Sequence, residues 1–263
     1  MTTKIDFKYL LNVAKNVNDL HLVQSKMQSI IDIAPEKAKT KGTYQNCAKK
    51  ILRMLKTDFQ YIPFNVFMEK GNSKLKFIAF SSLPIVDCFG AGDCVNYCYS
   101  LKAWRNPNAF FRQLQNSLLL RHSRNVVSRA LHQLPENKTV RLYVDGDFYS
   151  MSCLKFWFQM MRLRSDLKFY GYSKSLHLFS AYKGAFPPNY VLNKSNGSKF
   201  DDNKKIQSKI ESLPIYRGNF LAKKEVDNKK DFVCPGKCFD CLPNGKHACG
   251  VAKLKKDIVI QIH

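Results

Sequence analysis

The chain has 263 residues, of which 45% are hydrophobic, so it is long and apolar enough to bury a sizeable core. Lys and Arg number 43 against 20 Asp and Glu, which gives a formal net charge of +23. The apolar runs are too short to span a membrane and the first residues lack the order of a secretory signal, so we expect a cytoplasmic protein.

Residues 1–57 are predicted to form a helical N-terminal extension. The segments "FKYLLNVAKNVNDLHLVQSKMQSIIDIA" and "YQNCAKKILRMLKT" carry apolar residues at helical spacing, and Pro35 interrupts between them. Residues 61–70 and 74–82 are rich in Ile, Val and Phe, and "KGNSK" between them supplies turn residues. A hairpin is therefore predicted after the helices.

Residues 58–263 are predicted to form one α/β domain. The segments "TVRLYVDGDF", "LKFYGYSKS", "YVLNKSNG" and "DIVIQIH" read as strands, whereas residues 106–134 and 150–165 read as amphipathic helices. Strands separated by helices predict a mainly parallel sheet, open or closed into a partial barrel. The lysine-rich stretch 199–231 is predicted to be an insertion.

Seven of the nine cysteines lie in two compact clusters, "DCFGAGDCVNYCYS" and "VCPGKCFDCLPNGKHACG". Their members are Cys88, Cys94 and Cys98 in the first cluster, and Cys234, Cys238, Cys241 and Cys249 in the second. Clustered thiols without an export signal predict cysteine-rich metal-binding loops in a reducing compartment, because several soft ligands can converge on one metal.

The spacing of these cysteines favours an iron–sulfur cluster over zinc. Neither cluster as a whole has the spacing of the paired Cys-x2-Cys motifs of zinc ribbons, so we expect a [4Fe–4S] cluster, with zinc as the alternative. How the seven thiols divide among metal centres stays open. Gly90 and Gly92 in the first loop are predicted to let the backbone wrap around the bound centre and to offer amide donors to sulfur.

Three polar residues at the ends of predicted strands are candidates for catalysis. Asp145 and Asp147 flank Gly146 in "YVDGDFYS", and Lys174 follows the next strand in "GYSKS". Carboxyl ends of parallel strands are where α/β proteins place their sites. The alternatives are a tight turn in which an aspartate accepts backbone hydrogen bonds, and an exposed loop lysine.

The basic excess predicts an anionic partner. We expect nucleic acid, DNA or RNA, rather than a membrane surface, because no basic amphipathic helix with a clean apolar face is present. The segment "YCYSLKAWRNPNAFFRQ" interleaves aromatic and basic residues, as stacking on single-stranded bases requires, and we expect exposed aromatic side chains there at positions 99 and 104. The candidate nucleic-acid-binding residues are Tyr99, Lys102, Trp104, Arg105, Arg112, Arg121, Arg124 and Arg129.

The order of these motifs resembles a known family. The segment "CFGAGDCVNYCYSLKAWRNPNAFFRQLQN", followed by "RLYVDGDFYS", "FYGYSKS", "NYVLNKSNG" and the cysteine-rich tail, resembles the phage and plasmid family called gene product eighty-eight. The resemblance runs from Cys88 to the C-terminus, and the residues before it carry none. It implies a mobile-element origin, and hence the cytoplasm of a bacterial host.

The layout is also similar to that of radical S-adenosylmethionine enzymes, whose three-cysteine loop follows the first strand of a partial barrel. Those enzymes use Cys-x3-Cys-x2-Cys and a Gly-Gly-Glu turn on the next strand, whereas this chain has Cys-x5-Cys-x3-Cys and "DGDF". This similarity implies S-adenosylmethionine as a possible cosubstrate.

Three functions remain open at this point. The leading hypothesis is an iron–sulfur protein of a phage or plasmid that binds nucleic acid and acts on it as an enzyme. The alternatives are a radical-type enzyme and a zinc-stabilised nucleic-acid-binding protein without enzymatic activity. The sequence makes no prediction of oligomeric state.

Overall fold

The N-terminal part of the chain is helical, as predicted, and its first predicted segment is divided, so that it contains α1 (Phe7–Lys15), α2 (Leu20–Asp32) and α3 (Lys39–Lys56). The side chains of Asp6 and Asp19 cap the first two helices by accepting hydrogen bonds from backbone amides. The computed structural model describes residues 5–33, 39–70, 77–223, 225–227, 229–236, 238, 241, 248–250 and 256–261.

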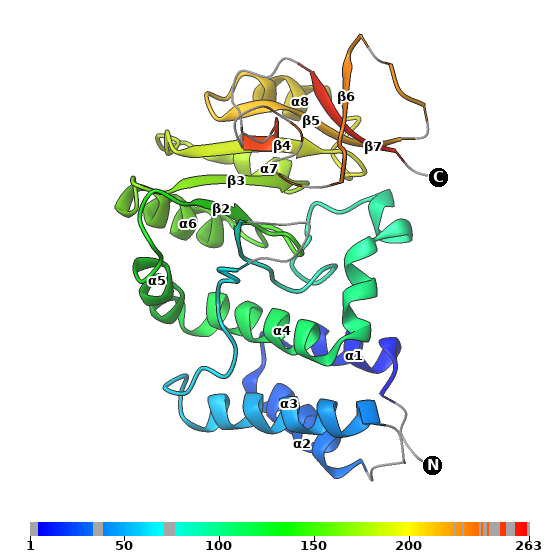
Figure 1. Cartoon of the computed structure of the whole chain (residues 1–263), viewed down its shortest axis with the longest axis vertical. Coiled ribbons are helices and arrows are strands. Elements are labelled where there is room, and N and C mark those ends of the chain that lie inside the picture. Colours follow the sequence, from blue (N-terminus) through cyan, green and yellow to red (C-terminus); the bar gives the residue numbers. More distant parts are fainter. Residues whose placement is uncertain are drawn as a thin grey trace.

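An open, all-parallel sheet of seven strands forms the centre of the α/β unit (Figure 1). The strands are β1 (Ile78–Ala79), β2 (Thr139–Leu142), β3 (Lys168–Ser173), β4 (Tyr190–Ser195), β5 (Tyr216–Lys223), β6 (Asp231–Val233) and β7 (Asp257–Gln261). Their order across the sheet is β1-β2-β3-β4-β5-β7-β6, so the predicted parallel arrangement is confirmed.

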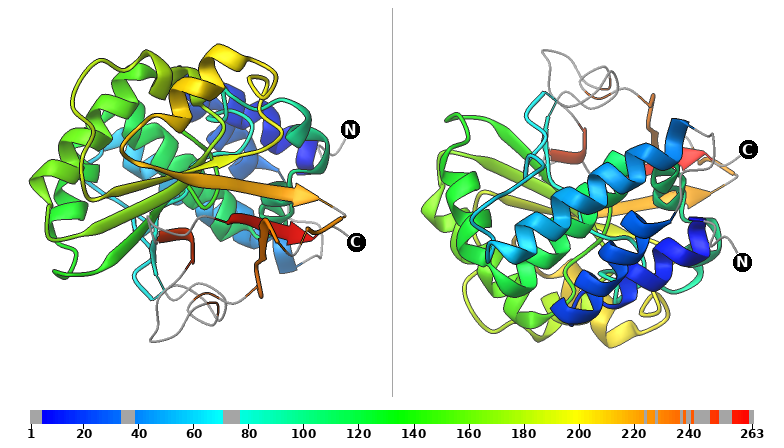
Figure 2. Two further views of the ribbon diagram at one scale, coloured as in Figure 1. Left: turned by 90° about the horizontal axis from the view of Figure 1, so that it is seen from above. Right: turned by 90° about the horizontal axis from the view of Figure 1, so that it is seen from below.

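The helices that accompany the sheet are α4 (Pro107–His122), α5 (Arg124–His132), α6 (Met151–Leu163), α7 (Leu176–Ala181) and α8 (Lys204–Glu211). The described residues also contain the short 3-10 helices η1 (Asp93–Tyr97), η2 (Tyr99–Arg105) and η4 (Ala248–Gly250). Helix α4 lies between the sheet and the helices α2 and α3, and α6, α7 and α8 cover one face of the sheet (Figures 1 and 2). The single helix predicted over 106–134 is divided at Ser123, which separates α4 from α5.

One hydrophobic core joins the N-terminal helices to the sheet. Its buried residues run from Leu10 on α1 through Phe110 on α4 to Leu192 on β4. Helices α1–α3 therefore contribute to the same core as the α/β unit.

Two sequence predictions about secondary structure are wrong. The described residues 61–70 contain no strand, and Met68 makes only an isolated antiparallel bridge to Ala79; residues 71–76 lie outside the described part. The lysine-rich stretch 199–231 is not an insertion, because it forms α8 and the interior strand β5. Lys204 and Lys205 are exposed on α8, and composition alone does not distinguish such a helix from an insertion.

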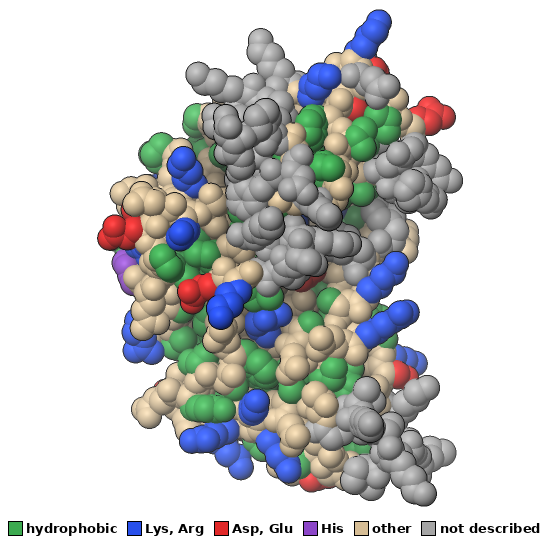
Figure 3. All heavy atoms as spheres, in the orientation of Figure 1, with side chains coloured by type: hydrophobic (Ala, Val, Ile, Leu, Met, Phe, Trp, Pro, Cys, Tyr) green, Lys and Arg blue, Asp and Glu red, His purple; other side chains and the backbone are tan. Residues whose placement is uncertain are grey.

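Lys and Arg side chains are spread over the surface shown in Figure 3. Within the part of the chain that the structure describes, no helix combines the length and apolar character that crossing a membrane requires.

Candidate functional site

A cavity of ≈ 410 Å³ lies at the carboxyl ends of the parallel strands. Every strand except β6 leads to it, either through its own residues or through the turn that follows. Parallel strands bring their carboxyl ends to one edge of the sheet, and the turns after them supply the polar groups of such sites.

All three cysteines of the first cluster line the cavity. Burial raises the pKa of the Cys88 thiol well above its usual value, and the charge of Asp147 raises it further. Burial also raises the pKa of Cys94, although the ammonium of Lys174 opposes this shift. In the absence of a metal ion these two thiols are therefore protonated at neutral pH.

The two glycines of the cysteine loop allow it to press against the ends of β3 and β4. A Cβ atom on Gly90 would lie 1.9 Å from the carbonyl oxygen of Lys174. The Ser198 hydroxyl lies 3.0 Å from the carbonyl oxygen of Gly90 and 2.9 Å from that of Lys174. The backbone N–H of Gly92 donates to the carbonyl of Gly197 at 2.9 Å. The turn after β4 therefore engages the Gly92 amide, and the role of this amide toward a sulfur stays a prediction.

Asp147 holds the turn after β2 against the turn after β3. Its carboxylate is 3% exposed and accepts four hydrogen bonds of 2.8–3.1 Å. The donors are the Ser173 hydroxyl and the backbone amides of Phe148, Lys174 and Ser175. This is the turn-stabilising role that the sequence left as the alternative for one of the two aspartates.

Asp145 has different partners, although it lies only two residues away. Its carboxylate accepts a hydrogen bond of 2.9 Å from the Gln113 amide, whose oxygen accepts the indole N–H of Trp104 at 2.8 Å. Burial raises the pKa of Asp145, and hydrogen bonds from Ser100 and Ser81 oppose the shift. The two carboxylates therefore belong to separate hydrogen-bond networks rather than forming a pair.

Lys174 is half-buried in the cavity rather than exposed on a loop. Its ammonium donates to the Ser195 hydroxyl at 2.6 Å, which fixes the cation at the end of β3 next to the end of β4. Lys174 thus shares the cavity with both aspartates and all three cysteines of the first cluster.

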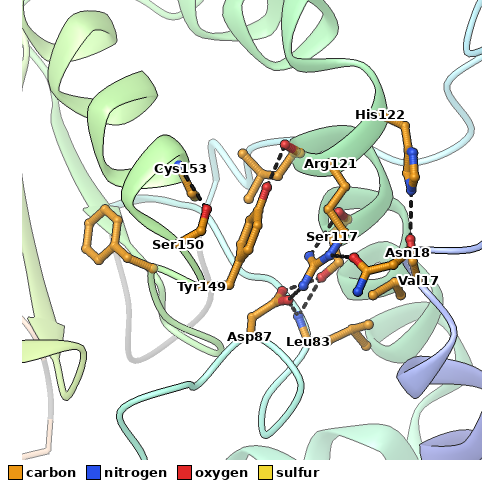
Figure 4. Close-up of polar contacts among 12 residues, drawn as sticks. Val17, Asn18, Leu83, Asp87, Ser117, Arg121, His122, Tyr149, Ser150 and Cys153 are labelled. Carbon is orange, nitrogen blue, oxygen red and sulfur yellow. Dashed lines mark hydrogen bonds and ion pairs between the residues drawn. The ribbon is translucent and has the colours of Figure 1, made fainter. Parts of the chain in front are cut away.

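A buried ion pair holds the cysteine loop on α4 (Figure 4). The Asp87 carboxylate, adjacent to Cys88, lies 2.7 Å from the Arg121 guanidinium and also accepts a hydrogen bond from the Ser117 hydroxyl. The guanidinium stacks over the ring of Tyr149 at 4.0 Å from its centroid. Arg121 therefore serves the protein interior, and the prediction that it forms part of a basic face is wrong.

The other candidates for nucleic-acid contact differ in their exposure. Lys102, Arg105 and Arg129 are exposed, and Arg112 is half-buried, which lowers the pKa of its guanidinium. The expected exposure of Trp104 is contradicted, because its side chain is only 2% exposed. The side chain at position 99 lies outside the described part of the structure.

Arg124 is also held within the protein. Its guanidinium donates to the carbonyl of Leu120 at 2.7 Å and to the hydroxyls of Tyr149 and Ser152 at 3.1 and 3.0 Å. Of the three arginines predicted to form one face, only Arg129 is left exposed at the surface.

None of the four cysteines of the second cluster lines the cavity, although Cys249 contacts Tyr172, which does. Cys249 belongs to η4. Its backbone carbonyl accepts a hydrogen bond of 2.9 Å from the side-chain amide of Asn193 on β4. The Tyr172 hydroxyl, on β3, hydrogen-bonds the Cys249 thiol, and burial raises the pKa of this thiol to about 11. The Cys241 sulfur accepts the amide of Ala248 at 3.3 Å.

All nine cysteines are free thiols. Among the described residues, no group of three or more His, Cys, Asp or Glu side chains stands at metal-binding spacing. The two cysteine clusters are thus placed by the fold, but their metal content stays a prediction.

Several residues that line the cavity escaped sequence analysis, among them Arg141 on β2, Asn196 after β4 and Phe220 on β5. The available signal was position, since each lies near the carboxyl end of a parallel strand. For Phe220, position could be used only if β5 was recognised as a strand, and the lysine-rich sequence around β5 did not indicate one.

The fold and the site together define an α/β protein with a cysteine-lined cavity at the carboxyl edge of a parallel sheet. A family model described as Gene product 88 matches residues 36–256, so the chain belongs to the gene product 88 family. The match begins well before Cys88, where the resemblance in the sequence began, and includes α3. No curated protein and no solved structure matches the chain.

Proposed function

We propose that this protein is an iron–sulfur enzyme of a phage or plasmid that binds nucleic acid in the cytoplasm of its host and acts on it. The observation that carries the proposal is the cavity, in which Cys88, Cys94 and Cys98 face the same space as Asp145 and Lys174. Soft metal ligands, a buried carboxyl group and a fixed ammonium are the parts that a cluster-dependent reaction requires.

The donor set suits an iron–sulfur cluster in kind. Three thiols from one loop are soft ligands, and three protein ligands leave one iron position open toward the cavity. Because the described thiols do not stand at metal-binding spacing, loading requires the loop 88–98 to draw them together. When bound, the cluster would supply electron transfer beside the substrate.

The other groups of the cavity have distinct tasks in this proposal. The ammonium of Lys174, fixed by Ser195, binds a phosphate or carboxylate group of the substrate. Asp145, whose pKa burial raises, holds or accepts a proton in the cavity. The oxygens of Asp147 are occupied by four donors, so this residue positions Lys174 instead of contacting substrate.

A radical-type enzyme that uses S-adenosylmethionine is the second candidate. It is supported by the place of the three-cysteine loop after β1 and by the consecutive parallel strands β1–β5 that surround the cavity. An open iron position facing a cavity is what such a cosubstrate needs. The third possibility, a zinc-stabilised binding protein, is supported by the basic charge alone.

Iron and acid-labile sulfide analysis of anaerobically purified protein, combined with oligonucleotide binding, tests the proposal. We expect iron with sulfide in the wild type and loss of the cluster that faces the cavity in a triple Cys88→Ser, Cys94→Ser, Cys98→Ser variant. Cys47→Ser is the matched control, because this lone buried thiol lies outside both clusters and should leave the iron content unchanged.

Zinc without sulfide would contradict the iron–sulfur proposal and favour the zinc-stabilised alternative. Absence of oligonucleotide binding would remove the nucleic-acid part. Absence of S-adenosylmethionine binding to cluster-loaded protein would remove the radical-type candidate.

A further inference from the structure

A second cavity, of ≈ 460 Å³, lies between α1 and η2. It opens beside the first turn of α1, next to the short helix that precedes α4 (Figure 1). Helix η2 borders both cavities, because Ser100 at its start lines the first and Arg105 at its end lines the second. The surface of the second cavity is aromatic and basic.

The aromatic part of the cavity has a fixed floor and an exposed ring. Trp104 is 2% exposed, and its indole N–H donates to Gln113 at 2.8 Å. The Tyr44 hydroxyl donates to the backbone carbonyl of Trp104 at 3.0 Å. The ring of Phe7 packs on this indole, with centroids 5.4 Å apart and planes inclined by 31°. Phe7 itself is 43% exposed, so a large aromatic surface remains open to a ligand.

Two cations stand at the same cavity. Lys102 and Arg105 are both exposed, and neither forms an ion pair with another described residue. One carboxylate, that of Asp6, also lines the cavity, and one of its oxygens accepts the Tyr9 amide as the cap of α1. The cavity therefore offers an aromatic ring and a net positive charge together. Lys and Arg side chains extend along the edge of the molecule at the height of η2 (Figure 3).

We propose that the second cavity binds an unpaired base of single-stranded nucleic acid, which stacks on Phe7 while the adjacent phosphates contact Lys102 and Arg105. The inference rests on the proposed nucleic-acid binding and names its substrate class. An exposed aromatic ring beside cations binds any base by its face, whereas a base paired in a duplex cannot enter a cavity.

The same geometry directs the bound strand toward the reaction cavity. The five residue steps from Ser100 to Arg105 rise by about 10 Å in a 3-10 helix, a distance that about three stacked nucleotides span. A hydrogen-bond chain also connects the two cavities, since Gln113 binds both Trp104 in one and Asp145 in the other. A strand that stacks on Phe7 and follows η2 would therefore reach the cysteine-lined cavity.

Fluorescence anisotropy with a labelled oligothymidylate, and with a duplex of the same length, tests this site. We expect Phe7→Ala to weaken single-strand binding by about tenfold or more, because stacking on one base contributes 1–3 kcal/mol. Its salt dependence should not change. Lys102→Gln and Arg105→Gln should each lower the slope of log K against log salt by about 0.7. Leu22→Ala, which removes a comparably exposed apolar side chain on α2, should bind as the wild type does.

Phe7→Leu keeps apolar bulk on α1 and separates loss of the ring from loss of the fold, so we expect it to bind as weakly as Phe7→Ala. Wild-type affinity in both folded variants would overturn the inference, as would duplex binding as tight as single-strand binding. If the wild type bound neither oligonucleotide, the proposed function itself would fail, and this inference with it.

Discussion

Asp145 and Asp147 illustrate how two neighbouring carboxylates take different tasks. The carboxylate of Asp147 is buried under four donors, of which three lie at the end of β3 or in the turn after it, and that of Asp145 joins Gln113 at the cavity wall. When N–H and O–H donors surround an aspartate, replacing it by asparagine leaves some of these donors without an acceptor. The difference between the two sites should therefore appear in stability.

Asp147→Asn should lower the free energy of unfolding by about 3 kcal/mol, because its amide group faces backbone N–H donors that then lack an acceptor. Asp145→Asn is the matched variant and should not lower the free energy of unfolding, since Asp145 lies at the cavity and its pKa is raised by burial. Urea denaturation followed by circular dichroism measures both values. Equal stability of the two variants would show that Asp147 does not anchor the turn.

Asp145 also predicts a pH dependence. Its pKa is raised above the ordinary 3.8, chiefly by burial, so folding favours the protonated form. Its contribution to stability is therefore present at low pH and is lost as the pH rises from 3.8 through the folded pKa. Asp145→Asn should gain melting temperature relative to the wild type between pH 4 and 7. A constant difference across this range would contradict the raised pKa.

At the scale of the elements, α4 connects the N-terminal helices with the cysteine loop. Arg121 near its end pairs with Asp87 beside the first cysteine and also donates to Asn18, in the loop between α1 and α2, at 2.8 Å. The next residue, His122, contacts the carbonyl of Val17 in the same loop at 2.8 Å. The last turn of α4 thus contacts both the loop that carries Asp87 and the loop between α1 and α2, which lie far apart in the sequence (Figure 4).

Arg121→Met should destabilise the protein by about 3–5 kcal/mol, because it leaves the Asp87 charge buried without a partner. The double variant with Asp87→Asn should recover a large part of this loss, since no unpaired charge remains. Denaturant unfolding of the two single variants and the double variant gives the coupling energy. Additive losses would show that the pair does not act as a unit.

At the scale of the whole molecule, the net charge of +23 does not act through every cation. Arg121 and Arg124 are bound inside the protein, while Arg129 on α5 and the residues at the end of η2 are exposed. Only exposed cations can release counterions from nucleic-acid phosphates.

Arg129→Gln should therefore weaken nucleic-acid binding and lower its salt dependence without changing the melting temperature. Arg124→Gln should lower the melting temperature and leave nucleic-acid binding and its salt dependence unchanged, because it removes the hydrogen bonds to Leu120, Tyr149 and Ser152. Binding titrations at several salt concentrations, together with thermal melts, distinguish the two. If Arg124→Gln reduced the salt dependence and left the melting temperature intact, the division between internal and surface cations would be wrong.

The sequence by itself determined the elements whose signals are local. Alternating strands and helices predicted the parallel sheet. The polar turns that follow the apolar runs around Val140 and Phe169 marked the ends of β2 and β3. These signals are local, because hydrophobic periodicity and turn residues act within a few positions. It failed where a local signal was concealed, as in the lysine-rich surroundings of β5.

Only the tertiary structure decided what each polar or aromatic side chain touches. Trp104 is buried because Gln113 and Tyr44 approach it from two other helices, and Arg121 is internal because Asp87 lies against α4. The same limit hid the division of tasks between the two aspartates. Contacts of this kind depend on residues far away in the chain, and no spacing or composition within one segment contains them.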